Sequence, residues 1–122
     1  MNYVEKHQLK DFSTDEKFIF ALECAHCGQL RQSTPIAFSK AGAVPDSEAK
    51  KLVYAALYRK EKELAMERAL RELRTMFSEC PICMKRVCDE CFLICEELDM
   101  CVSCAGRLHE RGEPVLIKQI SV

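Results

Sequence analysis

Four Cys-x-x-Cys pairs constrain this chain more than any other feature of its sequence. Nine of the 122 residues are cysteines. Eight of them form the pairs Cys24/Cys27, Cys80/Cys83, Cys88/Cys91 and Cys101/Cys104, which leaves Cys95 over. A chain this rich in cysteine is expected to be held together by disulfides or by metal ions.

The compartment implied by the sequence favours metal. The first residues lack the apolar run of a secretory signal, and no stretch approaches the 18 apolar residues of a membrane span. We therefore expect a cytoplasmic protein, although a form cut from a longer precursor would also lack a signal. Disulfides are rare in the cytosol, and an odd number of cysteines fits a disulfide framework poorly.

Zinc is the metal that this spacing predicts. A Cys-x-x-Cys turn places two thiolates on one side of a tight bend, which is half of a tetrahedral site with Zn–S distances of about 2.3 Å. Four halves predict two structural Zn²⁺ ions per chain. Only residues 84–87 separate the second pair from the third, so these two pairs can hardly enclose one ion.

A crossed arrangement avoids this difficulty. We expect Cys24, Cys27, Cys88 and Cys91 to form one Cys₄ site, and Cys80, Cys83, Cys101 and Cys104 to form the other. Two alternatives stay open at this point. The pairs can combine in sequential order, or one of the residues Cys95, His26 and His109 can replace a cysteine.

The residues around the pairs predict a small α+β fold. Residues 18–23 are rich in strand formers, and a second extended piece over 29–38 contains Pro35, which suits only an edge strand. The two pieces flank the first pair, so residues 17–45 are expected to form a zinc-knuckle hairpin. Gly28 supplies the positive φ angle that such a turn requires.

One long helix is predicted over residues 46–78. Asp46 or Ser47 offers an N-cap, and from there to about Phe77 strong helix formers dominate without Gly or Pro. Its apolar residues form two patches without a strict heptad, so we do not predict a coiled coil. The patches are Leu52, Val53, Ala56, Leu57 and then Leu64, Met66, Leu70, Leu73, Met76, Phe77.

The rest of the chain completes the predicted organisation. Residues 1–16 are expected to be a flexible arm, and 17–122 a single zinc-binding domain that includes a cysteine-rich finger over 79–112 and a tail over 113–122. The finger should contain a short helix from Val102 to about Arg111, with Gly112 as its stop. The tail can add a strand over 115–120.

The segment Cys80-Pro81-Ile82-Cys83-Met84-Lys85-Arg86-Val87-Cys88-Asp89-Glu90-Cys91 has the Cys-x₂-Cys-x₄-Cys-x₂-Cys spacing of FYVE-type zinc fingers, which it resembles. These fingers, like RING fingers, are cross-brace treble-clef modules, and the resemblance implies the crossed pairing.

The chain also departs from both families. Lys85 and Arg86 are the only bases between Cys80 and Cys104, against five acids, and 52 residues separate the first two pairs. RING fingers normally include a histidine ligand in the middle pairs, which this chain lacks. Lipid-headgroup binding and ubiquitin-ligase activity are therefore not carried over, and a cross-brace or zinc-ribbon scaffold with a helical insertion is expected.

A closed Cys₄ site leaves no open position for Lewis-acid catalysis, so we do not expect an enzyme. The leading expectation is a protein–protein interaction or adaptor module that binds a protein partner through the 46–77 helix, in a possible homo-oligomer. The acidic segment 92–100 is the candidate surface on the finger.

The alternative is a zinc-ribbon, transcription-related protein that binds nucleic acid, which the net charge of −1 and the interleaved acids make less favourable. A thiol-redox enzyme would need a thioredoxin-like frame around one pair.

Overall fold

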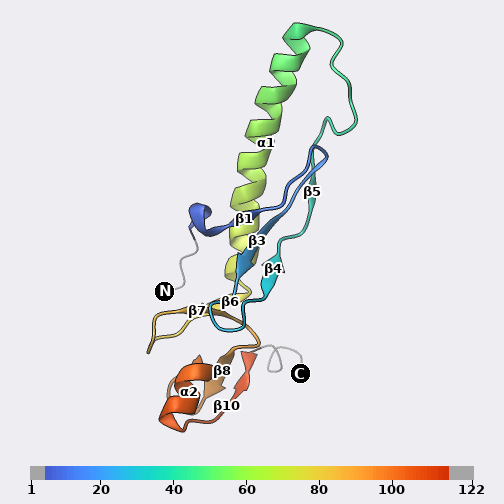
Figure 1. Cartoon of the computed structure of the whole chain (residues 1–122). Helices are drawn as coiled ribbons and strands as arrows, with labels where there is room; N and C mark the ends of the chain where they lie inside the picture. The colour runs from blue at the N-terminus through green and yellow to red at the C-terminus, as the bar shows by residue number, and fades with distance from the viewer. Residues whose placement is uncertain (1–4, 116–122) are drawn as a thin grey trace. The chain divides into compact units, whose positions relative to one another are not determined.

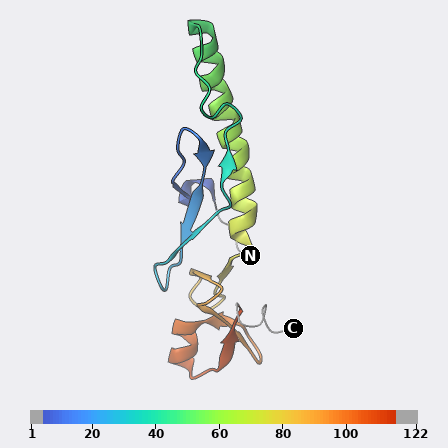
Figure 2. The same cartoon turned by 90° about the vertical axis from the view of Figure 1, so that its right-hand side faces the viewer.

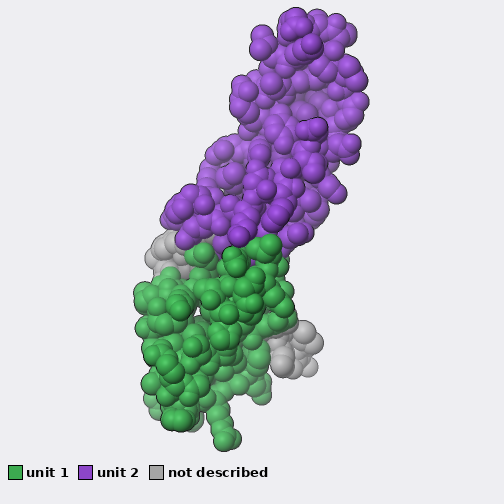
Figure 3. Space-filling model, viewed as in Figure 1, with its two compact units in different colours: residues 1–3, 23–31, 74–122 green, residues 4–22, 32–73 purple. Residues whose placement is uncertain are grey.

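The computed structural model describes residues 5–115, which fall into two compact units. The cysteine unit contains Glu23–Arg31 and the described part of Arg74–Val122, and the helix unit contains Gln32–Leu73 and the described part of Val4–Leu22. Figure 3 colours the two units separately. The prediction of one domain over 17–122 stays a prediction.

Helix α1, Glu48–Arg74, is the main element of the helix unit. Ser47 caps it, because its Oγ accepts a hydrogen bond of 3.1 Å from the amide of Lys50. The structure thus chooses between the two N-caps that the sequence offered. The helix ends before the predicted Phe77, since Phe77–Glu79 form strand β6 with a partner strand instead.

Short strands accompany α1 in its unit. Strand β2 (Lys17–Phe18) pairs antiparallel with β5 (Ile36–Ala37), and β1 (Lys10–Asp11) pairs antiparallel with β3 (Phe20–Glu23). Strand β4 (Leu30–Gln32), of which only Gln32 belongs to the helix unit, completes a sheet of order β1-β3-β4.

The two long strands predicted for 18–23 and 29–38 are therefore interrupted. Ser33 accounts for part of the break after β4. Its amide donates to the Phe20 carbonyl at 2.7 Å, and its Oγ accepts from the Phe20 amide at 3.0 Å.

The segment expected to be a flexible arm contains regular structure in its described part. Lys6–Gln8 form a turn of 3₁₀ helix, η1, and β1 follows it. The pairing of β1 with β3 supplies this order, and a reading of local sequence alone misses such a long-range partner.

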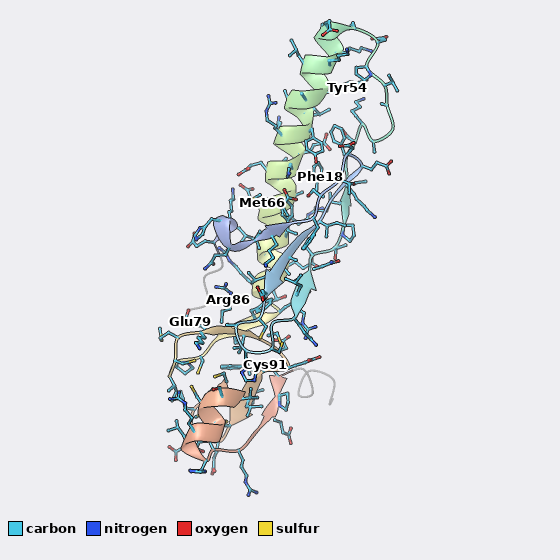
Figure 4. All side chains as sticks on the ribbon, viewed as in Figure 1. Phe18, Tyr54, Met66, Glu79, Arg86 and Cys91 are labelled. Atoms are coloured by element: carbon cyan, nitrogen blue, oxygen red, sulfur yellow. The ribbon has the colours of Figure 1, made fainter. Side chains whose placement is uncertain are left out.

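An aromatic core joins the strands to α1. Phe18, which Figure 4 labels, lies 5.1 Å from Tyr58 between ring centroids, and Phe38 lies 5.2 Å from Tyr58. Ala65 and Ala69 are buried beside these rings, and their small side chains let the strands approach the helix closely. Figures 1 and 2 show α1 running alongside the strands of its unit in both views.

The cysteine unit holds two small antiparallel sheets and one short helix. Strand β6 pairs with β7 (Arg86–Cys88). Strands β8 (Phe92–Cys95), β9 (Met100–Cys101) and β10 (Gly112–Pro114) form a sheet of order β10-β8-β9. Helix α2, Val102–Leu108, follows β9 directly.

The predicted end of α2 near Arg111 is wrong. His109 closes the helix in the left-handed conformation at φ 57°, and Gly112 lies opposite Cys95 in β10 rather than acting as a helix stop. A Cβ atom at Gly112 would come within 2.6 Å of the Ile94 carbonyl oxygen, so the close approach of β10 to β8 explains this glycine. The predicted strand over 115–120 lies, from residue 116 on, outside the described residues.

Candidate metal centres

The structure gathers the eight paired cysteines into two clusters of four sulfur atoms. The first cluster is Cys24, Cys27, Cys88 and Cys91, and the second cluster is Cys80, Cys83, Cys101 and Cys104. Within each cluster all four Sγ atoms lie within 4.8 Å of one another. This grouping is the crossed one, and neither the sequential order nor a histidine substitute appears in it.

The sulfur spacing suits a tetrahedral metal ion. The Sγ atoms of Cys27 and Cys88 are 3.8 Å apart, those of Cys88 and Cys91 are 3.7 Å apart, and those of Cys83 and Cys101 are 3.8 Å apart. A tetrahedron with Zn–S distances of 2.3 Å has edges of about 3.8 Å. A disulfide would need sulfurs about 2.0 Å apart, and all nine cysteines are free thiols. Each cluster can therefore hold one metal ion.

The first half of each cluster is a hairpin turn with the same backbone hydrogen bonds. In the first knuckle the Gly28 amide donates to the Cys24 carbonyl at 3.0 Å, and the Cys24 amide donates to the Gln29 carbonyl at 3.0 Å. In the second knuckle the Met84 amide donates to the Cys80 carbonyl at 2.8 Å. The Cys80 amide donates to the Lys85 carbonyl at 2.9 Å, which completes the same turn.

The second halves differ in their secondary structure. Cys88 ends β7 and Cys91 follows it in a tight turn, in which the Cys91 amide donates to the Cys88 carbonyl at 2.9 Å. Cys101 is instead the N-cap of α2, and its Sγ accepts from the amide of Cys104 in the first turn of that helix. A short helix and a strand turn thus present two sulfurs equally well.

Backbone amides point at the first sulfur of each knuckle. Cys24 Sγ accepts from the amides of Cys88, His26 and Cys27 at 3.3, 3.4 and 3.5 Å. Cys80 Sγ accepts from the amide of Cys101 at 3.4 Å. Amide donors of this kind stabilise a thiolate.

These contacts separate the acidities of the cysteines in each cluster. Burial raises the pKa of Cys24, but the amides of Cys27, Cys88 and His26 outweigh it and bring the pKa to about 6. The amides of Cys101, Cys83 and Ile82 likewise outweigh burial and lower the pKa of Cys80 to about 6.

The opposite shift is found among the partners of these two thiolates. Burial, the first cause, raises the pKa values of Cys88 and Cys91, and burial raises the pKa of Cys101 to about 12. Without metal, each cluster therefore contains one cysteine that ionises easily, Cys24 or Cys80, beside buried thiols that stay protonated. A metal ion must displace those protons when it binds.

Each cluster also receives one arginine side chain. Arg107 Nη2 donates to Cys104 Sγ at 3.0 Å, and Arg31 Nη2 donates to Cys88 Sγ at 3.7 Å while it pairs with Glu90 at 3.4 Å. Four thiolates around a divalent ion carry a net charge of −2, which a guanidinium beside a sulfur partly offsets. The cysteine spacing gave no sign of either arginine contact. The position of Arg107 three residues after Cys104 on a predicted helix was the available signal.

The remaining candidate ligands lie outside the clusters. Cys95 is half-buried in β8, where its Sγ lies 3.9 Å from the Leu93 carbonyl oxygen. His26 is exposed in the first knuckle, and His109 is the exposed cap of α2. On the candidate acidic surface of the finger, Phe92 is buried and Leu98 is exposed.

The sulfur atoms, drawn in yellow in Figure 4, include that of the labelled Cys91.

The chain matches no protein-family model, no curated protein and no solved structure. The FYVE-type resemblance therefore rests on the cysteine spacing alone. None of the helices in residues 5–115 combines the length and apolar character needed to cross a bilayer.

Proposed function

We propose that this chain is a non-catalytic zinc-finger protein in which two structural Zn²⁺ ions support a protein–protein interaction or adaptor surface. The two four-sulfur clusters carry this proposal. Cys27 and Cys88 are 61 residues apart in sequence, yet their sulfurs lie 3.8 Å apart. An ion shared by such distant segments stabilises the folded chain.

The donor sets argue for a structural role. Four thiolates fill the tetrahedral coordination of zinc and leave no position for a water molecule or a substrate. Zinc sites that catalyse hydrolysis keep such an open position. The proposed ions therefore hold Cys24–Cys27, Cys80–Cys91 and Cys101–Cys104 in place without taking part in a reaction.

The proposed interaction surface is helix α1, Glu48–Arg74, which forms most of the predicted 46–77 segment. Leu52 is 74% exposed, and Val53 and Leu64 are each 58% exposed, on a helix whose other face packs on the aromatic core. Large apolar side chains on an exposed helix are suited to bind another protein. The exposed acidic residues 96, 97 and 99 offer a second, weaker surface on the finger.

Nucleic-acid binding is the less favoured alternative. Several lysines of the helix unit contact carboxylates: Lys6 contacts Glu63, Lys62 contacts Asp11 at 2.6 Å, and Lys51 contacts Glu48 at 3.1 Å. Phosphate binding needs clustered positive charge instead. An electrophoretic mobility assay with single-stranded and duplex DNA and RNA at low salt should give no shift. A salt-sensitive shift would favour the alternative.

Thiol counting tests the zinc part of the proposal. A chromogenic thiol reagent added to the protein, purified under reducing conditions, should react quickly with one thiol, and the variant Cys95→Ser should lose that reaction. After chelation in denaturant all nine cysteines should react. Rapid reaction of all nine before chelation would contradict the proposal.

The interaction part needs a separate measurement. A photo-crosslinking amino acid at Leu52 should give a discrete protein adduct in cells, whereas the same group at Glu113, which is exposed in β10, should not. Equal adduct formation at both positions would argue against the helix as the binding surface.

A further inference from the structure

The first turns of α1 carry an apolar face with nothing packed on it among the described residues. Ala49, Leu52, Val53 and Ala56 follow the spacing i, i+3, i+4, i+7, which places them on one side of a helix. All four are exposed. In both views these turns lie beyond the ends of β2 and β5, with only the loop before α1 beside them (Figures 1 and 2).

This face is distinct from the face that binds the core. Tyr58, Ala65 and Ala69 contact the aromatic cluster. At 100° per residue they lie roughly opposite the position of Leu52 and Ala56 on the helix circumference. The apolar face therefore has no role in the packing of its own unit.

We propose that this face binds the same face of a second copy of the chain, with the two helices antiparallel. The proposal rests on the interaction role proposed above for residues 46–77 and names the partner. With the two-fold axis between Leu52 and Val53, each Leu52 meets Val53 of the other copy and each Ala49 meets Ala56. The alanines at both ends of the face allow the helix backbones to approach closely.

Charge complementarity argues for a second copy in this orientation. Acids, Asp46 and Glu48, stand at the start of the face, and bases, Arg59 and Lys60, stand just beyond its end; all four side chains are exposed. Antiparallel pairing brings the acids of each copy beside the bases of the other, at both ends of the contact. Parallel pairing would place like charges together.

The contacts that Asp46 and Glu48 make within their own chain are weak enough to be replaced by contacts with a second copy. Asp46 lies 3.9 Å from Lys50 and Glu48 lies 3.1 Å from Lys51, both on the exposed surface of the same chain. Such exposed pairs are weak and exchange readily. The contact covers only a few helical turns, so we expect a weak dimer with a Kd of about 1–100 μM.

Sedimentation velocity of the full-length, zinc-loaded protein over a range of concentrations tests the proposal. The sedimentation coefficient should rise with concentration from a monomer to a dimer value. Val53→Asp should raise the Kd at least tenfold. The matched control is Leu108→Asp, which places the same charge at an exposed apolar residue outside α1. It should leave the Kd unchanged.

A charge exchange tests the antiparallel register. Asp46→Lys and Lys60→Asp should each weaken the dimer several-fold, and the double variant should restore it. Rescue cannot come from the contact between Asp46 and Lys50 within one chain, because the double variant does not rebuild that contact. Failure of the rescue would overturn the register.

A protein that stays monomeric at millimolar concentration, or a dimer that survives Val53→Asp, would overturn the dimer proposal. The zinc content of each sample separates this failure from a failure of the proposed function. A monomer that binds two Zn²⁺ ions would refute only the dimer. A chain without zinc would refute the proposed function whatever its oligomeric state.

Discussion

In the first cluster the residue after the second knuckle cysteine is Gly28, with φ 75°, whereas in the second cluster it is Met84, with φ 64°. Both turns close with the same pair of backbone hydrogen bonds. Methionine enters this left-handed conformation at a cost of about 1–2 kcal/mol, which glycine avoids. The second knuckle keeps the left-handed turn although methionine disfavours that conformation. The turn geometry therefore follows from the placement of the two sulfurs and not from the residue at this position.

The surroundings of the two clusters differ further. Cys27 is exposed in the first cluster, whereas its counterpart Cys83 is half-buried. The first cluster joins segments 61 residues apart and the second joins segments 18 residues apart. These differences predict that the two sites bind and release metal differently, although their knuckles have the same backbone hydrogen bonds.

Removal of one ligand should have the largest effect and should separate the sites. Cys88→Ser and Cys101→Ser each remove a buried ligand from one cluster, and each variant should bind one Zn²⁺ ion rather than two. Loss of a structural site costs on the order of 10 kcal/mol of metal-binding free energy. Metal analysis by mass spectrometry measures the content. Cys95→Ser is the matched control and should keep two ions; loss of an ion there would place Cys95 in a site.

Acid should weaken both sites. Zinc must displace protons from Cys88 and Cys91, whose pKa values are raised, and at least two displaced protons predict an affinity loss of at least about 100-fold per pH unit below neutrality. In the second cluster burial raises the pKa of Cys101 to about 12, so zinc must displace its proton as well. Below pH 6 the thiolates of Cys24 and Cys80 are also protonated, so the loss steepens in both.

Chelator competition between pH 8 and 6 measures this dependence on the single-site variants, with Cys101→Ser reporting the first cluster and Cys88→Ser the second. A zinc affinity that stays constant from pH 8 to pH 6 in either variant would contradict the displacement of protons from these cysteines.

The arginines should set the rate of metal loss. Arg107→Gln removes a 3.0 Å contact to Cys104, and zinc transfer from the second cluster to a chelator should accelerate roughly tenfold. Arg31→Gln should accelerate transfer from the first cluster less, because its contact to Cys88 is 3.7 Å and Glu90 shares the guanidinium. Arg111→Gln, at an exposed arginine beyond α2, is the control. An equal effect of all three substitutions would mean that the arginines act on the rate of zinc transfer only through the overall surface charge.

The knuckle turns should give the smallest effects, of opposite sign. Gly28→Ala has room for the added Cβ but strains the backbone, so it should destabilise the protein by about 1 kcal/mol. Met84→Gly should relieve the backbone strain of the folded protein. The substitution also raises the entropy of the unfolded chain, which opposes this gain, so the net effect should be neutral or stabilising by less than about 1 kcal/mol. Urea denaturation of the zinc-loaded protein measures both. Marked destabilisation by Met84→Gly would refute the strain argument.

Much of the candidate site was accessible from sequence because cysteine spacing is a local signal. The short segment between Cys83 and Cys88 predicts the crossed grouping, and the structure places the sulfurs in that grouping. The long helix was accessible for the same reason, since helix propensity and the Ser47 cap are local.

What the sequence analysis missed depends on contacts between distant residues. The helix stops at Arg74 because Phe77 pairs with Cys88 across β6 and β7, and β1 exists because Lys10 pairs with Ala21. Gly112 looked like a helix stop, but its role follows from the approach of β10 to Ile94. The arginine contacts to sulfur likewise require the folded arrangement, because Arg31 and Cys88 are 57 residues apart.

The central claim is that thiolates from distant segments share metal ions, and native mass spectrometry of the protein purified under reducing conditions tests it most directly. The account predicts a mass equal to the chain plus two Zn²⁺ less four protons, because at a given charge state each Zn²⁺ replaces two protons. A metal-free chain that is folded, or one whose mass is reduced by disulfide formation, would contradict it.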